Sequence, residues 1–219
     1  MNNNSNTNIL KQFKSLYETQ KYEDALTLLH ENKPMFDPGV YEFNIGLIYM
    51  KQDFYALARI NFEKAKEFGF MTNELGSALT EVKDALDVTV LEQSSSASDS
   101  INEVLFDLPK ELFLSISILF LILFTLLYKR IGSMPLRILS LVITIFPIVF
   151  YLTVISDKSE VILLEDHAVR RGPSKMFEEV QLVPKGMKVF INDQVDGWNF
   201  IVHPKSHQGW IKTKSLEKI

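Results

Sequence analysis

The sequence predicts a multidomain protein in which an all-α helical repeat, a transmembrane α-hairpin and a small all-β barrel follow one another. Three observations carry this prediction. Small and aromatic residues recur at helix-pair spacing in residues 1–88. Two almost uncharged apolar runs occupy the middle of the chain. Short alternating segments, punctuated by glycine and aspartate, fill residues 158–219.

The first domain, residues 1–88, is predicted to hold two helix–turn–helix repeats followed by a capping helix, with the second helix pair at Val40–Lys51 and Tyr55–Glu67. Gly46 and Ala58 are small, as required where two antiparallel helices cross closely. Ala25 takes the place of Ala58 in the preceding repeat. The other signature positions are Ile45, Tyr49, Tyr55, Phe62 and Ala65. These spacings resemble tetratricopeptide repeats, which implies a TPR-like stack of helix pairs.

The tetratricopeptide resemblance also implies a face that binds a peptide or protein partner. We call the following six side chains the predicted partner face: Leu10, Lys14, Tyr17, Phe43, Leu47 and Met50. Leu47 stands where carboxylate-binding versions of the repeat carry an asparagine, so capture of a C-terminal carboxylate is not expected. The alternative is that these residues pack the repeats against the capping helix or against the rest of the chain.

Residues 89–111 are predicted to form a linker with two parts. The serine-rich run Gln93–Ser100 has no apolar periodicity, which is typical of a flexible segment. After it, four apolar residues share one helical face: Ile101, Val104, Leu105 and Leu108. This spacing indicates a short interfacial helix. A plain extension of the next helix is the alternative, although Pro109 favours a break.

Two apolar runs, residues 112–128 and 138–155, are predicted to be transmembrane helices. Each approaches the about 20 apolar residues that a spanning helix needs, and a helix satisfies its own backbone polar groups in lipid. Neither run contains an ionisable side chain, so we expect an anchor in the lipid bilayer and not an ion pathway. The alternative is a pair of helices buried in one soluble core.

The turn between these runs, residues 129–137, carries the basic residues Lys129, Arg130 and Arg137. This excess of positive charge predicts a cytoplasmic turn. The expected localisation is a bacterial inner membrane crossed twice, with the N- and C-terminal domains in the periplasm. Met1–Leu10 lacks the basic and apolar pattern of a signal peptide, so we favour a signal that was removed before Met1. The alternatives are that the first span carries the N-terminal domain across the membrane, or that the charge rule fails for this chain.

The last domain, residues 158–219, contains the segment AVRRGPS at Ala168–Ser174. The later elements of the pattern are Lys185-Gly186, Asp196-Gly197-Trp198 and Gly209-Trp210-Ile211. Their order resembles bacterial SH3 domains, which implies a small SH3-like barrel. Trp198 and Trp210 are expected to supply much of its core. With Arg170 they are the candidate residues of the SH3-like surface, where Arg170 either meets an acidic ligand or stacks over an aromatic ring.

Composition and motifs argue against several classes of function. The chain has no cysteine, which removes disulfides, thiol nucleophiles and cysteine-based metal sites. Residues 1–100 carry 9 Lys and Arg against 15 Asp and Glu, so no nucleic-acid partner is expected. Only His203 and His207 have metal-like spacing, and two ligands without a third are weak support for a site. No pattern supplies a nucleophile, a base and an orienting group together, so we predict a non-enzyme without cofactor or metal.

The order of the domains resembles BatE-type proteins of the Bacteroides aerotolerance (Bat) operon. This resemblance implies a complex with Bat proteins that carry von Willebrand factor A domains, linked to a MoxR-type ATPase and to oxidative-stress tolerance. The predicted function is a membrane-anchored adaptor that presents the helical repeats and the barrel to protein partners. The alternative is a cell-envelope sensor whose barrel binds peptidoglycan or peptides.

Overall fold

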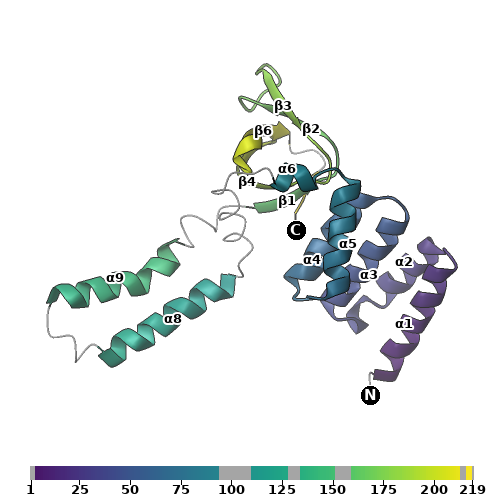
Figure 1. Ribbon diagram of the computed structural model, residues 1–219, viewed down its shortest axis with the longest axis horizontal. Coiled ribbons are helices and arrows are strands. Elements are labelled where there is room, and N and C mark those ends of the chain that lie inside the picture. Colours follow the sequence, from purple (N-terminus) through teal and green to yellow (C-terminus); the bar gives the residue numbers. More distant parts are fainter. Residues whose placement is uncertain (1–2, 94–109, 128–133, 151–158, 213–215, 219) are drawn as a thin grey trace. The chain divides into compact units, whose positions relative to one another are not determined.

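The structure, a computed structural model, describes residues 3–93, 110–127, 134–150, 159–212 and 216–218 (Figure 1). The chain divides into two compact units. The first unit combines the N-terminal helices, Met1–Ser94, with the C-terminal strands, Glu160–Ile219, and the second is Ser95–Ser159. Each unit is described here by itself.

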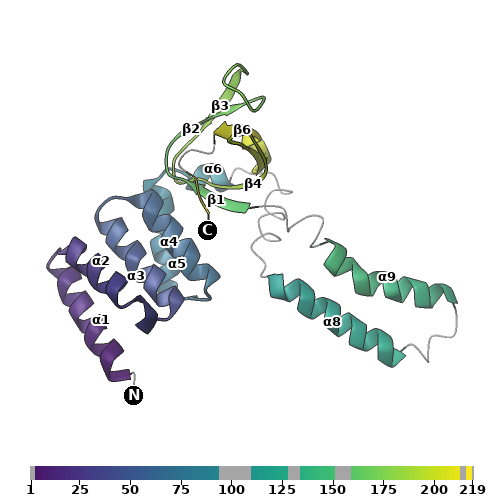
Figure 2. The same cartoon turned by 180° about the vertical axis from the view of Figure 1, so that it is seen from behind.

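The helical part of the first unit consists of consecutive helices joined by short turns (Figures 1 and 2). They are α1 (Asn3–Glu18), α2 (Tyr22–Glu31), the 3-10 turn Lys33–Met35, α3 (Pro38–Lys51), α4 (Tyr55–Glu67), α5 (Asn73–Ala85) and α6 (Thr89–Gln93). Side-chain caps fix two of the starts. The Asp37 carboxylate accepts hydrogen bonds from the first backbone N–H groups of α3, and the Thr72 hydroxyl accepts one from Leu75 at 3.2 Å.

Small residues lie where these helices cross. Ala25 and Ala58 are fully buried, on α2 and α4 respectively. A Cβ atom added to Gly46 of α3 would stand 2.5 Å from the ring of Phe62 on α4. A larger residue at that position would therefore push α3 and α4 apart. A separate hydrophobic cluster binds α1, α2 and α3 together: Phe13, Ala25, Leu29, Tyr41, Ile45 and Ile48.

The strands of the first unit form one seven-stranded sheet (Figure 1). They are β1 (Ser159–Leu163), β2 (His167–Arg170), β3 (Glu179–Val183), β4 (Lys188–Val195), β5 (Trp198–His203), β6 (Gly209–Lys212) and β7 (Leu216–Lys218). The order across the sheet is β3-β2-β6-β5-β4-β1-β7. The pairings β1–β7, β2–β3, β2–β6, β4–β5 and β5–β6 are all antiparallel.

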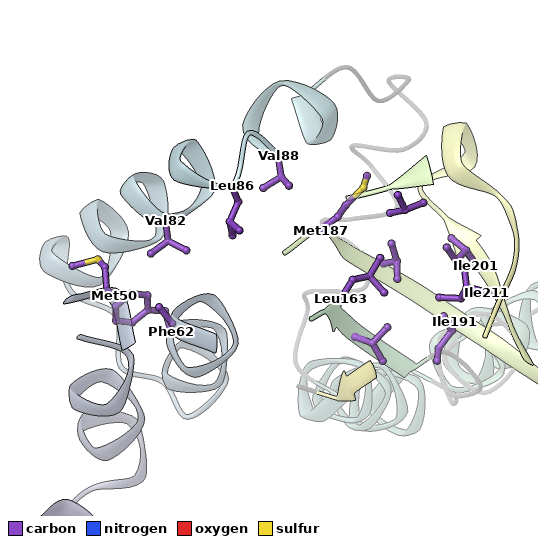
Figure 3. Packing of buried hydrophobic residues seen from close by; sticks show 14 of the residues in the cluster. Met50, Phe62, Val82, Leu86, Val88, Leu163, Met187, Ile191, Ile201 and Ile211 are labelled. Carbon is purple, nitrogen blue, oxygen red and sulfur yellow. The ribbon is translucent and has the colours of Figure 1, made fainter. Parts of the chain in front are cut away.

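One hydrophobic core is shared by the helices and the sheet (Figure 3). On the helical side, Val82 of α5 points toward this core, and so does Leu86, the C-cap residue of α5. Val88, two residues further along the chain, also belongs to the core. On the sheet side the core is aliphatic: Val161, Leu163, Val169, Val183, Met187, Val189, Ile191, Ile201 and Ile211. Helices and strands therefore form one packed unit, although the whole of the second unit separates them in the sequence.

The described residues of the second unit form two helices, α8 (Lys110–Leu127) and α9 (Met134–Phe150), which contact each other. Phe113, Ser117 and Thr144 are buried in this pair, and the Ser117 hydroxyl donates to the carbonyl of Phe113 at 2.8 Å. Many large aliphatic side chains of both helices are exposed. Pro147 lies inside α9, where it removes one backbone hydrogen bond.

The predicted transmembrane hairpin is contradicted: among the residues that the structure describes, no helix is long and apolar enough to cross a membrane. The two helices are 18 and 17 residues long, against about 20 apolar residues for a typical span. α8 begins with Lys110 and Glu111, and α9 includes Arg137, so the uncharged run is shorter than the helix in both. Residues 128 and 151–155, which the predicted spans included, lie outside the described residues.

This finding also overturns the predictions that depended on the hairpin. The two-pass inner-membrane localisation, with periplasmic domains and a cytoplasmic turn, loses its basis. Of the predicted topology signal, Lys129 and Arg130 lie outside the described residues, and Arg137 falls within α9. The corrected fold class, for the described part of the chain, is eight α-helices and one seven-stranded antiparallel sheet.

Candidate functional site

The six residues of the predicted partner face come from two helices, α1 and α3. On α1, Leu10 and Lys14 are exposed and Tyr17 is half-buried. On α3, the remaining three residues are more enclosed, because Phe43 and Leu47 pack against the shared core and Met50 is buried in it. The α1 half is therefore open to a partner, and the α3 half supports the packing alternative.

Phe43 is held by two other aromatic rings. Its ring centroid lies 5.6 Å from that of Phe62 and 5.0 Å from that of Phe70. Phe70 follows the turn after α4, at the position where the repeat motif usually has a proline. The departure from the motif thus supplies an aromatic contact that stabilises the α3–α4 pair.

Tyr17 lies at the end of α1 in a short row of aromatic rings. Its centroid is 5.9 Å from that of Phe13 in a stacked arrangement and 6.0 Å from that of Tyr22 in an edge-on one. Burial raises the pKa of Tyr17, and the nearby Tyr22 and Glu81 raise it further. The Tyr17 phenol therefore stays protonated well into the alkaline range and can donate a hydrogen bond.

Tyr55 lies at the start of α4. Its hydroxyl donates a hydrogen bond to Asp53 Oδ1 at 2.7 Å. This hydrogen bond is the largest cause that raises the pKa of Tyr55, followed by burial and by the charges of Asp53 and Glu81. The charge of Glu81 on α5 is the last-named cause of the raised pKa in both Tyr17 and Tyr55.

The sequence interpretation missed Glu81, although a signal was present. Lys14 and Leu47 occupy the same place in consecutive repeats, and Glu81 follows Leu47 after one further repeat period. Extending the repeat into the capping helix α5 would have placed Glu81 on the predicted partner face. The interpretation treated α5 only as a cap and did not assign it a binding residue.

A second polar cluster joins the helices to the sheet around a fully buried arginine, Arg59 of α4. Its Nη1 donates to the carbonyl oxygen of Gly186 at 2.6 Å and lies 2.7 Å from Glu92 Oε1. Its Nη2 donates to Glu92 Oε2 at 3.0 Å and lies 3.8 Å from Glu63 Oε1. Arg59 thus connects α4 and α6 to the turn before β4.

Glu92 completes this connection from α6. Lys83 Nζ lies 3.2 Å from Glu92 Oε2, and the Lys188 backbone N–H donates to Glu92 Oε1 at 3.4 Å. Burial by itself would raise the pKa of Glu92, but the Arg59 guanidinium, Lys83 and the Lys188 N–H together hold it below its usual value. We call Arg59, Glu92, Lys83 and the backbone of residues 186–188 the Arg59 network.

The Arg59 network was not predicted, and the sequence carries little signal for it. Glu92 belongs to the segment predicted as a linker, where the structure has α6. Gly186 lies 127 residues beyond Arg59, so no local pattern links the two. Gly186 has a positive φ of 80°, and a side chain there would collide with Leu86.

The three candidate residues of the SH3-like surface have different surroundings. Arg170 donates hydrogen bonds to the carbonyl oxygens of Lys175 at 2.9 Å and Phe177 at 2.7 Å, and it pairs with Glu179. Arg170 therefore holds the loop between β2 and β3. Trp198 is only 8% exposed, whereas Trp210 is half-buried with its ring centroid 5.2 Å from that of Phe200.

The two histidines with metal-like spacing do not meet a third ligand in the part of the chain that the structure describes, where no group of three or more metal-binding side chains occurs. His203 is buried beside Phe190, with ring centroids 5.6 Å apart. His207 Nδ1 lies 2.9 Å from the Ser206 hydroxyl, and burial lowers the pKa of His207.

Comparison with known proteins gives no family assignment: no family model, no curated protein and no solved structure matches this chain.

Proposed function

We propose that this protein is an adaptor that binds a protein partner along the predicted partner face and holds the β-sheet beside it. The observation that carries the proposal is the Arg59 network, which ties the helices to the sheet with a fully buried cation. A buried charge is costly unless it is paired, so such a joint holds the two parts in one arrangement. A partner would then meet two surfaces whose spacing is fixed.

The exposed half of the predicted partner face suits a protein ligand. Leu10 offers an apolar contact, and Tyr17 combines a large apolar ring with a hydroxyl donor. Tyrosines of this kind are enriched at the energetic centres of protein interfaces. The half-buried Phe43 and Leu47 support these contacts from α3 and lose little conformational entropy on binding.

The resemblance to BatE-type proteins supplies the first partners to test. They are proteins with von Willebrand factor A domains and the MoxR-type ATPase of a Bat system, with a broad role in aerotolerance. This choice rests on the order of the domains in the sequence.

The experiment measures binding of the purified full chain to co-expressed candidate partners. A mild non-ionic detergent is included, because α8 and α9 expose large aliphatic side chains. We expect Leu10→Asp to weaken binding at least ten-fold. Met35→Asp is the matched control, since Met35 is an exposed apolar residue outside the predicted partner face. Equal effects of the two variants, or retention of no candidate partner, would contradict the proposal.

A second candidate function is ligand binding by the loop between β2 and β3. Met176 of this loop is 95% exposed and Phe177 is 48% exposed. Arg170 fixes the loop by donating hydrogen bonds to two of its backbone carbonyl oxygens. Exposed apolar side chains on a fixed loop favour contact with a peptide or a cell-wall fragment. Co-sedimentation of the full chain with purified peptidoglycan tests this function, with Met176→Ser as the variant expected to reduce it.

A further inference from the structure

Strand β3 lies at one edge of the sheet that the described strands form, with β2 on its inner side (Figure 1). An edge strand presents backbone N–H and C=O groups with which another strand can pair. Residues 181–183 pair with β2 in regular register, because the register shift of this ladder lies further toward the loop, where Arg170 pairs with Glu179. These three residues therefore offer a regular backbone edge to a further strand.

The exposed face of this edge is apolar. Val180 is 51% exposed and Leu182 is 61% exposed, although both belong to a paired strand. Natural proteins often protect an edge strand from pairing by placing a lysine or a proline in it. β3 contains neither, since Pro184 and Lys185 follow its last residue, Val183. The edge thus combines exposed apolar side chains with a backbone that can accept a strand.

From these observations we infer that β3 pairs antiparallel with β3 of a second copy of this chain, about a two-fold axis at Leu182. We call this pairing the β3 edge contact. Leu182 then faces its own counterpart, and Val180 faces Pro184 of the second copy, because the strands of an antiparallel ladder run in opposite directions. Both cross-strand pairs are apolar, which stabilises such a ladder. The contact lies outside the predicted partner face, so it does not depend on the proposed function.

Charge complementarity favours a second copy in this direction. In the β3 edge contact Glu179 stands opposite Lys185 of the other copy, and symmetry makes this pair occur twice. Lys185 is exposed, and its backbone N–H donates to Asp166 Oδ1 at 2.7 Å, which holds the main chain beside the edge. Glu179 contacts Arg170, and its side chain is still 57% exposed. A parallel pairing in register would instead place Glu179 opposite its own counterpart, where like charges repel.

The β3 edge contact is small, so we expect a dimer that exchanges with the monomer. β3 has five residues, whereas a standard stable interface involves about 20–30 residues on each side. The dimer fraction should therefore rise with protein concentration. Each copy brings one predicted partner face, so a partner with two binding segments would gain affinity through effective concentration.

Because the chain has no cysteine, one engineered disulfide tests the contact. Opposite residues of an antiparallel ladder have Cα atoms about 4.5–5.5 Å apart, which a disulfide can bridge. The full-length variant Leu182→Cys, purified in mild non-ionic detergent, should form a disulfide-linked dimer under gentle oxidation. Val180→Cys is the matched control, because Val180 is similarly exposed but lies four positions from its counterpart, about 13 Å along the strand. We expect Leu182→Cys to cross-link at least ten-fold faster.

A charge reversal tests the register. Lys185→Glu, added to Leu182→Cys, places two carboxylates opposite each other in each pair and should slow cross-linking about five-fold. Lys11→Glu is the matched control, since it makes the same change of charge at an exposed position of α1. Circular dichroism of each variant verifies that it is folded before its rate is compared.

The outcomes decide for or against the β3 edge contact. Faster cross-linking of Leu182→Cys, slowed by Lys185→Glu and not by Lys11→Glu, supports it. Equal rates for Leu182→Cys and Val180→Cys would show random collision and overturn it. A Leu182→Cys chain that stays monomeric would leave this edge to a strand of another protein, which also overturns the inference. Equal slowing by both charge reversals would show a general charge effect and overturn the register.

Discussion

Glu92 of the Arg59 network and Glu81 of α5 are both carboxylates, but they differ in what surrounds them. Glu92 is enclosed and contacts Arg59, Lys83 and the Lys188 backbone within the chain. Glu81 is exposed, and its charge is a minor cause of the raised pKa of Tyr17 and Tyr55. The comparison teaches that burial among several partners of the same chain marks a carboxylate as structural, whereas an exposed carboxylate stays in contact with solvent.

The largest effect is expected from removing the cation of the Arg59 network. Arg59→Leu leaves Glu92 buried without its main partner and should lower the free energy of unfolding by about 3–5 kcal/mol. Denaturant unfolding measures this change. The double variant Arg59→Leu/Glu92→Leu should recover part of the loss, because neither charge remains. Arg171→Ala is the control, since the exposed pair Arg171–Glu178 contributes at most about 1 kcal/mol.

The next largest effect concerns the turn at Gly186, whose carbonyl oxygen accepts a hydrogen bond from Arg59. Gly186→Ala places a Cβ against Leu86 at a positive φ of 80°, and we expect a loss of about 1–3 kcal/mol. Gly76→Ala is the matched control, because Gly76 lies within α5 with open space around it. Alanine there should raise stability by up to about 1 kcal/mol. Similar changes in both variants would contradict the close contact at residue 186.

Acid should weaken the Arg59 network, because Glu92 is one of its charged members. The pKa of Glu92 is lowered in the folded chain from its ordinary value of 4.5, so its stabilising contribution is present above pH 4.5 and is lost as the pH falls through the folded pKa. Thermal unfolding between pH 7 and pH 3 follows this loss. The variant Glu92→Gln should show a flatter profile than Glu81→Gln, and identical profiles would refute the assignment.

The smallest effect is expected at alkaline pH. The pKa of Tyr17 is raised from 10.0, chiefly by burial, so its contribution is present below pH 10 and is lost as the pH rises through the folded value. Ultraviolet titration of phenolate absorbance measures it. Because Glu81 is a minor cause, Glu81→Gln should lower the Tyr17 pKa only slightly. A return to the ordinary value in this variant would mean that charge, and not burial, dominates.

Local patterns in the sequence predicted the elements better than they predicted the contacts between them. Helix α4 has the predicted bounds, Tyr55–Glu67, because its small and apolar residues recur with helical spacing. The expected tryptophan contribution to the core holds for one of the two residues: Trp198 is buried, whereas Trp210 is half-buried, and the cluster shared with the helices is aliphatic on its sheet side. The Arg59 network escaped prediction because its hydrogen bonds join residues up to 127 positions apart, which no periodicity reveals.

The transmembrane prediction failed for a different reason. Hydropathy alone identified the apolar runs around α8 and α9, but it did not identify where each helix starts and ends. In the described residues α8 begins at Lys110 and α9 includes Arg137, so charged residues take up part of each helix.

The shared core can be completed only late in synthesis, because its two halves lie far apart in the sequence. Val82, Leu86 and Val88 leave the ribosome long before Met187, against which their cluster is completed. At translation rates of about 5–20 residues per second, the apolar side of α5 waits roughly 5–20 seconds for its partner strands. During that interval the nascent helices expose an unfinished hydrophobic surface, and such surfaces are prone to aggregate.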